Sequence, residues 1–110
     1  LMLTVSNGRS LGGAFQIAPN ASVTDGELDI AYFADCTVAQ RARAFASAFR
    51  GTHGQLSTVR TEKRDELTLE FAAAPLMEID GELYRASTPR VVIQCLPRAL
   101  RVISAEGAIR

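Results

Sequence analysis

Short segments in which apolar and polar residues alternate are the feature that most constrains how this chain can fold. In residues 66–71, Leu67, Leu69 and Phe71 alternate with polar side chains. A period of two is typical of a half-buried β-strand, because successive side chains point to opposite faces of a sheet. Further strands are predicted at residues 1–5, 14–17, 28–33, 59–63, 76–79, 91–95 and 100–103. The chain is therefore expected to be mainly β.

Turn-forming residues separate these segments. The boundaries are four dipeptides and three prolines: Asn7-Gly8, Gly12-Gly13, Asp25-Gly26, Asp80-Gly81, Pro75, Pro89 and Pro97. Glycine, asparagine and aspartate tolerate the backbone conformations of tight turns, and proline interrupts strand pairing. The predicted strands are thus short and closely connected.

One segment has helical instead of alternating periodicity. Val38, Ala42, Phe45 and Phe49 recur at helical spacing, after a capping residue at Thr37 and before a glycine. This pattern predicts one amphipathic α-helix over residues 37–50. Many strands and a single helix favour an antiparallel β-sandwich, or squashed barrel, over a parallel α/β sheet, which needs a helix between most of its strands.

Length and composition narrow the class of protein. The 110 residues fit one domain, 1–110, and the 12 basic and 12 acidic residues cancel, so a nucleic-acid partner is not expected. No apolar run approaches the ~20 residues of a membrane-spanning helix, and Cys36 and Cys95 lack the spacing of a zinc or redox pair. Because a strand-like segment begins at once at Leu1, we expect the chain to be part of a longer polypeptide.

Three clusters of glycine and acidic residues remain as candidate functional motifs, at residues 7–13, 18–29 and 79–82. The common enzyme signatures, such as a phosphate-binding loop or a Gly-x-Ser-x-Gly elbow, are absent. In order and together, an Asn-Gly…Gly-Gly stretch, an Ala-Pro-x-Ala-x-x-x-Asp-Gly-x-Leu-Asp segment and a later Asp-Gly-Glu resemble the carboxy-terminal domain of the superfamily of diacylglycerol kinases, sphingoid-base kinases and bacterial lipid kinases. The resemblance extends from Val5 to about Ile103.

The resemblance implies the C-terminal domain of a two-domain enzyme that transfers the γ-phosphoryl group of ATP to a lipid alcohol. Diacylglycerol is the first expected acceptor, followed by a sphingoid base or another lipid alcohol. ATP would be bound mainly by an N-terminal nucleotide-binding domain of the same polypeptide, whose Gly-Gly-Asp-Gly-Thr motif is absent here, so the chain alone is expected to be inactive. The implied location is cytoplasmic, with peripheral contact at the inner face of the membrane.

Glu82 and Asp80 are the catalytic residues that the resemblance implies. The family's matching glutamate accepts the proton of the substrate alcohol, so Glu82 is expected to act as general base, with Asp80 helping to position it or the metal network. Read without the resemblance, Asp80-Gly81-Glu82 is a hairpin turn signal.

The resemblance also implies a structural Mg²⁺ ion around the Asp25-Gly26 turn. The matching positions are Ser22, Asp25 and Glu27, with Ser22 and Glu27 acting through backbone carbonyls. Many relatives have a second acidic residue where this chain has Thr24. The alternative is that Asp25-Gly26 is only a turn.

Three further residues have weaker functional interpretations. His53, the single histidine, is expected to be structural, because a lone histidine on a loop has no visible partner. Arg43 and Arg50 lie on one helix face, which either contacts an anionic membrane or is simply solvated.

Two other functions stay open for the whole chain. One is a non-catalytic β-sandwich binding module. The other is kinship with nicotinamide-nucleotide kinases, against which the 18–29 motif argues.

Overall fold

The computed structural model describes residues 2–10, 16–35, 37–50 and 59–105. The elements are β1 (Met2–Ser6), β2 (Leu28–Phe33), α1 (Val38–Arg50), β3 (Val59–Arg64), β4 (Glu66–Glu70), β5 (Leu76–Ile79), β6 (Glu82–Arg85) and β7 (Arg90–Gln94). Every strand pair in this part of the chain is antiparallel. The prediction of a mainly β fold with one helix is confirmed.

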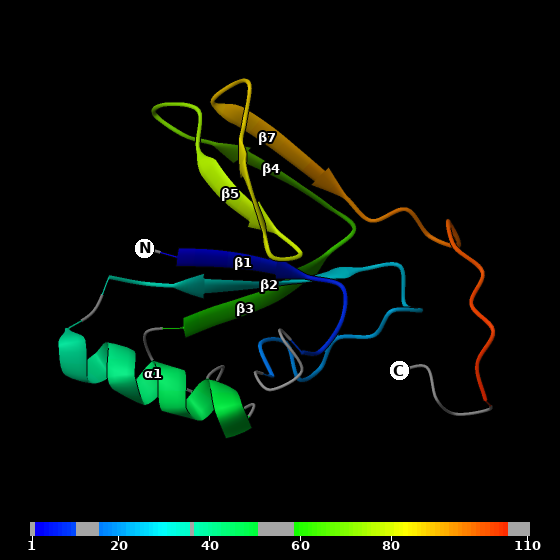
Figure 1. The fold of residues 1–110 in the computed structure, drawn as a ribbon, viewed down its shortest axis with the longest axis horizontal. Helices are drawn as coiled ribbons and strands as arrows, with labels where there is room; N and C mark the ends of the chain where they lie inside the picture. Colours follow the sequence, from blue (N-terminus) through cyan, green and yellow to red (C-terminus); the bar gives the residue numbers. More distant parts are fainter. Residues whose placement is uncertain (1, 11–15, 36, 51–58, 106–110) are drawn as a thin grey trace.

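The strands form three small antiparallel sheets. One has the order β1-β2-β3, and the others are the pairs β4-β7 and β5-β6. Figure 1 shows the three-stranded sheet in the middle of the molecule, with α1 on one side of it and the two β-ribbons on the other. This layering is consistent with the predicted β-sandwich-like architecture.

Strand β2 forms the centre of the core. Leu28 and Ile30 share one face of the strand and Ala31 lies on the other, yet all three are buried, with Ile30 only 1% exposed. The other buried apolar residues of the described chain are Ala18, Ala21, Val59 and Leu67. A strand that is buried on both faces lies between layers, so β2 is the central strand on which its neighbours β1 and β3 are positioned.

Helix α1 begins with a reciprocal capping arrangement. The backbone N–H of Gln40 donates to Thr37 Oγ1 at 3.3 Å, and the backbone N–H of Thr37 donates to Gln40 Oε1 at 2.8 Å. Each side chain thereby satisfies a backbone donor of the first turn. The predicted cap at Thr37 is confirmed. Of the predicted apolar stripe, Val38 is exposed, whereas the side chains of Phe45 and Phe49 lie outside the described part.

Two predicted strands differ from the structure. Residues 100–103 form no regular structure, Ile103 is fully exposed, and no strand of the described residues pairs with them. Of residues 14–17, the first two lie outside the described part, and Gln16 and Ile17 are not in a strand. Conversely, the strand β6 is not predicted, because its sequence Glu-Leu-Tyr-Arg does not alternate between apolar and polar residues; all four residues are exposed.

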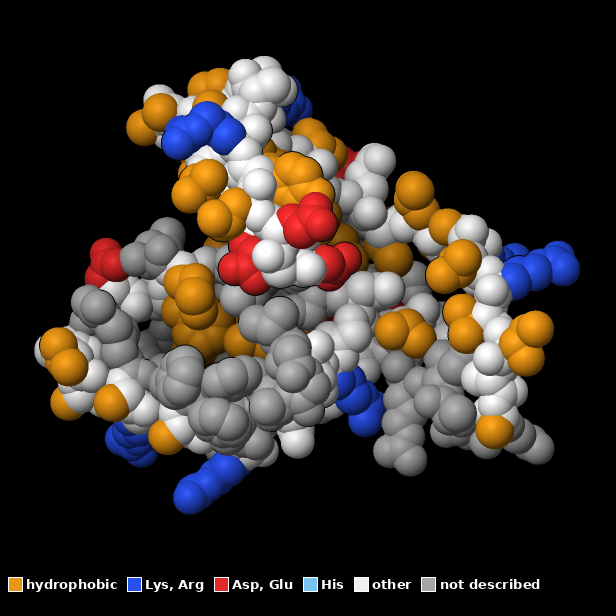
Figure 2. Space-filling model, in the orientation of Figure 1, with side chains coloured by type: hydrophobic (Ala, Val, Ile, Leu, Met, Phe, Trp, Pro, Cys, Tyr) orange, Lys and Arg blue, Asp and Glu red, His pale blue; other side chains and the backbone are white. Residues whose placement is uncertain are grey.

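The molecule exposes more surface than its size requires. Its accessible surface is 8330 Å², whereas a compact protein of 11.8 kDa exposes about 5,900 Å². Its radius of gyration is 14.9 Å, against about 13 Å for a compact chain of this length. Large apolar side chains are exposed on both β-ribbons and along residues 95–105, the C-terminal arm, including Leu76, Ile79, Leu83, Val92, Leu96, Leu100 and Val102. Figure 2 shows apolar side chains spread over this face of the molecule. Much apolar surface is thus exposed.

Candidate functional site

The hairpin β5–β6 holds the two predicted catalytic residues, Asp80 and Glu82. Its loop is the two-residue pair Asp80-Gly81, and both residues have positive φ, 50° and 88°. Positive φ at both loop positions defines a type I′ turn, for which Asp-Gly is a preferred sequence. Asp80 therefore lies at the tip of the hairpin and Glu82 is the first residue of β6.

The strand register places Glu82 on a partly apolar face of this hairpin. Glu82 is opposite Ile79, and Tyr84 is opposite Met77, so all four side chains share one face, while Glu78 and Leu83 lie on the other. Ile79 is 53% exposed and Tyr84 45%. Figure 2 shows acidic side chains gathered where the hairpin turns, beside apolar ones.

The Glu82 carboxylate accepts one hydrogen bond from within the hairpin. Tyr84 Oη donates to Glu82 Oε2 at 2.7 Å. The same bond raises the pKa of Tyr84, because loss of the phenolic proton would place two negative charges together. Oε1 makes no hydrogen bond with the other described residues, so Glu82 has one oriented oxygen and one available acceptor.

The Asp25-Gly26 turn lies directly before β2. Gly26 has φ 75°, and Asp25 Oδ1 accepts the backbone N–H of Glu27 at 3.0 Å, which is an Asx-type turn. Ser22 Oγ lies 3.1 Å from Thr24 Oγ1. The structure therefore brings the three proposed metal ligands, Ser22, Asp25 and Glu27, into one local turn.

Lys63 supplies a positive charge to this turn from a distant part of the chain. Its Nζ donates to Asp25 Oδ2 at 2.9 Å and to Asp29 Oδ2 at 3.1 Å. The Lys63 ammonium, together with the Glu27 N–H, lowers the pKa of Asp25, and the two aspartates raise the pKa of Lys63. Asp25 is therefore held ionised by an internal partner.

The donor set at this turn does not fit a Mg²⁺ ion. Mg²⁺ requires near-octahedral oxygen coordination at 2.0–2.1 Å. Asp25 is the single side-chain carboxylate proposed as a ligand, and an ammonium and a backbone N–H already engage its two oxygens. Across the described ranges there is no group of three or more His, Cys, Asp or Glu side chains able to hold a metal. Bound Mg²⁺ would have to share Asp25 with Lys63 or displace it.

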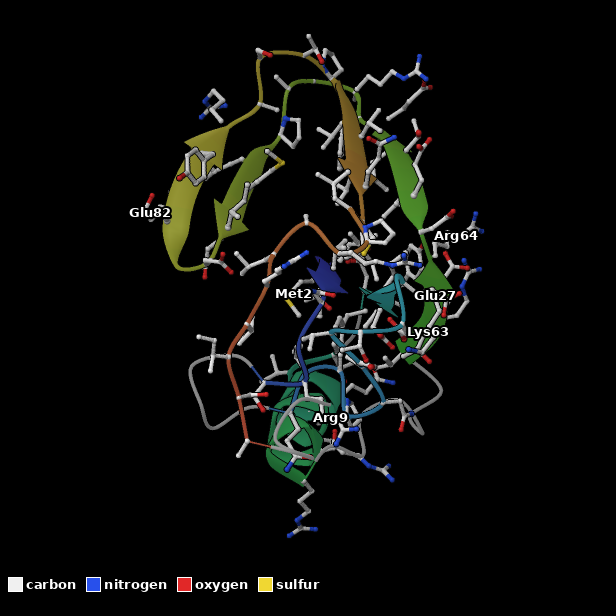
Figure 3. The ribbon with its side chains drawn as sticks, turned by 90° about the vertical axis from the view of Figure 1, so that its right-hand side faces the viewer. Met2, Arg9, Glu27, Lys63, Arg64 and Glu82 are labelled. Atoms are coloured by element: carbon white, nitrogen blue, oxygen red, sulfur yellow. The ribbon has the colours of Figure 1, made fainter. Side chains whose placement is uncertain are left out.

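The turn and the hairpin are separate sites. Figure 3 shows Glu82 on the outer ribbon, away from Glu27 and Lys63, which lie together at the other side of the molecule. The predicted catalytic pair and the predicted metal ligands therefore do not form one cluster in this chain.

A loop segment at residues 18–21 is fixed to the first motif by Arg9. The Arg9 side-chain Nε donates to the carbonyl of Ala21 at 3.0 Å, and the N–H of Ala18 donates to the carbonyl of Arg9 at 3.1 Å. Ala21 is completely buried. The first two glycine-containing motifs thus contact each other, while Gly12 and Gly13 lie outside the described residues.

A third polar cluster lies on β2 and β3. Tyr32 Oη donates to Glu62 Oε1 at 2.6 Å, Arg64 Nε lies 3.1 Å from the same oxygen, and the Arg60 guanidinium lies 4.7 Å from the Tyr32 ring centre. Tyr32 and then Arg64 lower the pKa of Glu62. These groups neutralise one another, so the cluster presents no free base.

The other residues named in the sequence analysis lie either outside these sites or outside the described residues. His53 and Cys36 lie outside the described part of the chain, Cys95 is a free, half-buried thiol, and Arg43 and Arg50 are exposed on α1. No helix of the described ranges is long and apolar enough to cross a membrane. Membrane contact by α1 stays a prediction.

Sequence reasoning missed Lys63 and Tyr84. One sequence feature could have drawn attention to Lys63, since it is the single lysine beside 11 arginines. Tyr84 carried another, because a residue two positions after Glu82 in a strand shares its face.

Comparison with known proteins places these motifs in a family. The sequence model of the family described as "YegS C-terminal NAD kinase beta sandwich-like domain" matches residues 1–104. Diacylglycerol kinases from two strains of Mycobacterium tuberculosis, CDC 1551 / Oshkosh and ATCC 25618 / H37Rv, are each 32% identical over 97 residues, which is 88% of this chain and 30% of the relative. The chain thus spans less than a third of the length of these relatives. No solved structure matches it.

Proposed function

Because the chain belongs to the family of YegS C-terminal β-sandwich-like domains, within the superfamily of diacylglycerol and other lipid kinases, we propose that it is the substrate-side domain of an ATP-dependent kinase that phosphorylates a lipid alcohol. Diacylglycerol is the first candidate acceptor, and a sphingoid base or another lipid alcohol is the second. The mycobacterial relatives, which are diacylglycerol kinases, support this order.

The observation that carries the proposal is the position of Glu82. Its carboxylate lies on an exposed, partly apolar face of the β5–β6 hairpin, oriented by Tyr84 through one oxygen. A lipid alcohol offers a hydroxyl group attached to apolar chains. Glu82 would meet the hydroxyl, while Ile79 and the Tyr84 ring on the same face would contact the apolar part.

The chemistry follows from that contact. The lipid hydroxyl oxygen attacks the γ-phosphorus of ATP, the bond from that phosphorus to the β–γ bridging oxygen breaks, and ADP leaves. Glu82 Oε1 accepts the hydroxyl proton as the new P–O bond forms. Asp80 positions Glu82 through the tight turn that starts β6.

The nucleotide belongs to another part of the proposed enzyme. ATP and the Mg²⁺ that accompanies it would be bound by an N-terminal domain of the same polypeptide, because phosphoryl transfer requires several groups that position and neutralise the phosphates. The surplus exposed surface of this chain supports a covering partner. Such an enzyme would work in the cytoplasm, with peripheral contact at the inner membrane face where its acceptor lies.

The test is phosphate transfer by the full-length protein. The protein is incubated with γ-labelled ATP and Mg²⁺ together with diacylglycerol, a sphingoid base or NAD, and the labelled products are separated. The proposal predicts label in a lipid phosphate and none in the nucleotide acceptor. Transfer to NAD, or to no acceptor by a protein that binds ATP, would contradict it.

A further inference from the structure

The Asp25-Gly26 turn already contains a cation, the ammonium of Lys63. We infer that Lys63 is the resident cation of this turn and that the turn keeps its place on the sheet without a divalent metal ion. The inference rests on the 2.9 Å and 3.1 Å contacts of Nζ with Asp25 and Asp29, and it does not depend on kinase activity.

The sheet register explains how one lysine reaches both carboxylates. Asp29 of β2 and Lys63 of β3 are direct cross-strand partners, so their side chains lie on one face. Asp25 precedes Asp29 by four residues, and the turn at Gly26 brings its carboxylate back over the strand. A lysine head group is a compact charge with three donors, which can serve two carboxylates from one position, whereas the planar arginine fork suits a single carboxylate.

Both carboxylate oxygens of Asp25 already have partners within the chain. Oδ2 contacts Lys63 and Oδ1 accepts the Glu27 N–H, while Ser22 Oγ contacts Thr24 Oγ1. A divalent ion on Asp25 would lie within a few ångströms of the ammonium and be repelled by it. Removing Lys63 reverses this balance, since Asp25 and Asp29 then form a pair of carboxylates with no counter-charge, which is a set that a hard cation prefers.

The contacts of Lys63 with Asp25 and Asp29, a charge clamp, act together with Arg9 on the described part of the loop between β1 and β2. Arg9 holds residues 18–21 at Ala21, and Lys63 holds the turn at Asp25. Gly26 lies beside Pro97 of the C-terminal arm. A Cβ atom added at Gly26 would lie 3.6 Å from Pro97 Cγ. The turn that Lys63 contacts is therefore next to the C-terminal arm in space.

The experiment is thermal melting of this chain in EDTA and over a series of MgCl₂ concentrations. For the wild type we expect the same melting temperature throughout. Lys63→Met should melt lower in EDTA and regain several degrees with Mg²⁺, as the ion replaces the lost charge. Arg64→Met is the matched control, because Arg64 is the cation next to Lys63 in sequence and pairs with Glu62, not with the turn. It should show no response to Mg²⁺.

Two results would overturn the inference. One is a saturable rise of the wild-type melting temperature with Mg²⁺, which would mean that the ion displaces Lys63. The other is a Lys63→Met protein that melts like the wild type and ignores Mg²⁺. If Lys63→Met does not fold, Lys63→Gln, which keeps a hydrogen-bond donor and removes the charge, is measured under the same conditions and against the same two outcomes.

Discussion

Gly26→Ala is expected to destabilise the chain through its backbone alone. Gly26 has φ 75°, a left-handed conformation that costs an L-residue about 1–2 kcal/mol. An added Cβ would lie 3.6 Å from Pro97 Cγ and 3.9 Å from Pro97 Cβ, which is ordinary contact, so no steric penalty is added. For a domain of this size the loss corresponds to a melting temperature lower by about 4–16 °C.

Two other glycines make the prediction a controlled comparison. Gly81 has φ 88° and open space around it, so Gly81→Ala should lose a similar amount. Gly8 also has open space but is not among the positive-φ glycines, so Gly8→Ala should change stability by no more than about 1 kcal/mol, in the stabilising direction. Gly26→Asn should recover part of the loss, because asparagine tolerates this conformation better than alanine.

The assay is thermal and urea denaturation of the four variants beside the wild type. The reasoning would be refuted if Gly26→Ala had the melting temperature of the wild type while that of Gly81→Ala was several degrees lower. That pattern would mean that the turn before β2 does not need positive φ.

Three further predictions concern the core, the charge clamp and the hairpin. Ile30→Ala should cost about 2–5 kcal/mol in urea denaturation, because Ile30 is 1% exposed in the central strand; a loss below about 1 kcal/mol would contradict its place in the core. Because Lys63 lowers the pKa of Asp25, the stability from this pair is present above the unfolded pKa of about 3.9 and is lost as the pH falls through the lower folded value. The gap in melting temperature between wild type and Lys63→Met, measured from neutral pH downward, should therefore narrow in acid, and a gap that stays constant would argue against the pair. Tyr84→Phe in the full-length protein should lower turnover, but not in a Glu82→Gln background, since Tyr84 acts through that carboxylate; equal losses in both backgrounds would assign Tyr84 another role.

The sequence predicted strands well where apolar and polar residues alternate or where strand-forming residues are concentrated. The alternation of residues 66–71 and the β-rich run at 28–33 correspond to β4 and β2. The type I′ turn at Asp80-Gly81 was also readable, because few other residues adopt positive φ at both loop positions. The exposed strand β6 offered no such alternation and was missed.

What the sequence could not predict depends on contacts between distant residues. Residues 100–103 have the composition of a strand, but a strand also needs a neighbouring edge, and no strand of the described residues pairs with them. The 18–29 motif correctly indicated a turn at Gly26, whereas the partner of its aspartate is Lys63, 38 residues further along the chain. That register is set by the pairing of β2 with β3, which no local pattern encodes.

The most direct test of the proposed role of Glu82 is the turnover of Glu82→Gln in the full-length protein with ATP and diacylglycerol. Glu78→Gln is the matched control, because it makes the same change on the opposite face of the same hairpin. A positioned general base contributes about 10²–10⁴-fold, so Glu82→Gln should lose that much kcat with ATP affinity and melting temperature unchanged, while Glu78→Gln keeps its activity. A Glu82→Gln enzyme within about threefold of the wild-type kcat, well short of that range, would contradict the assignment of Glu82 as proton acceptor.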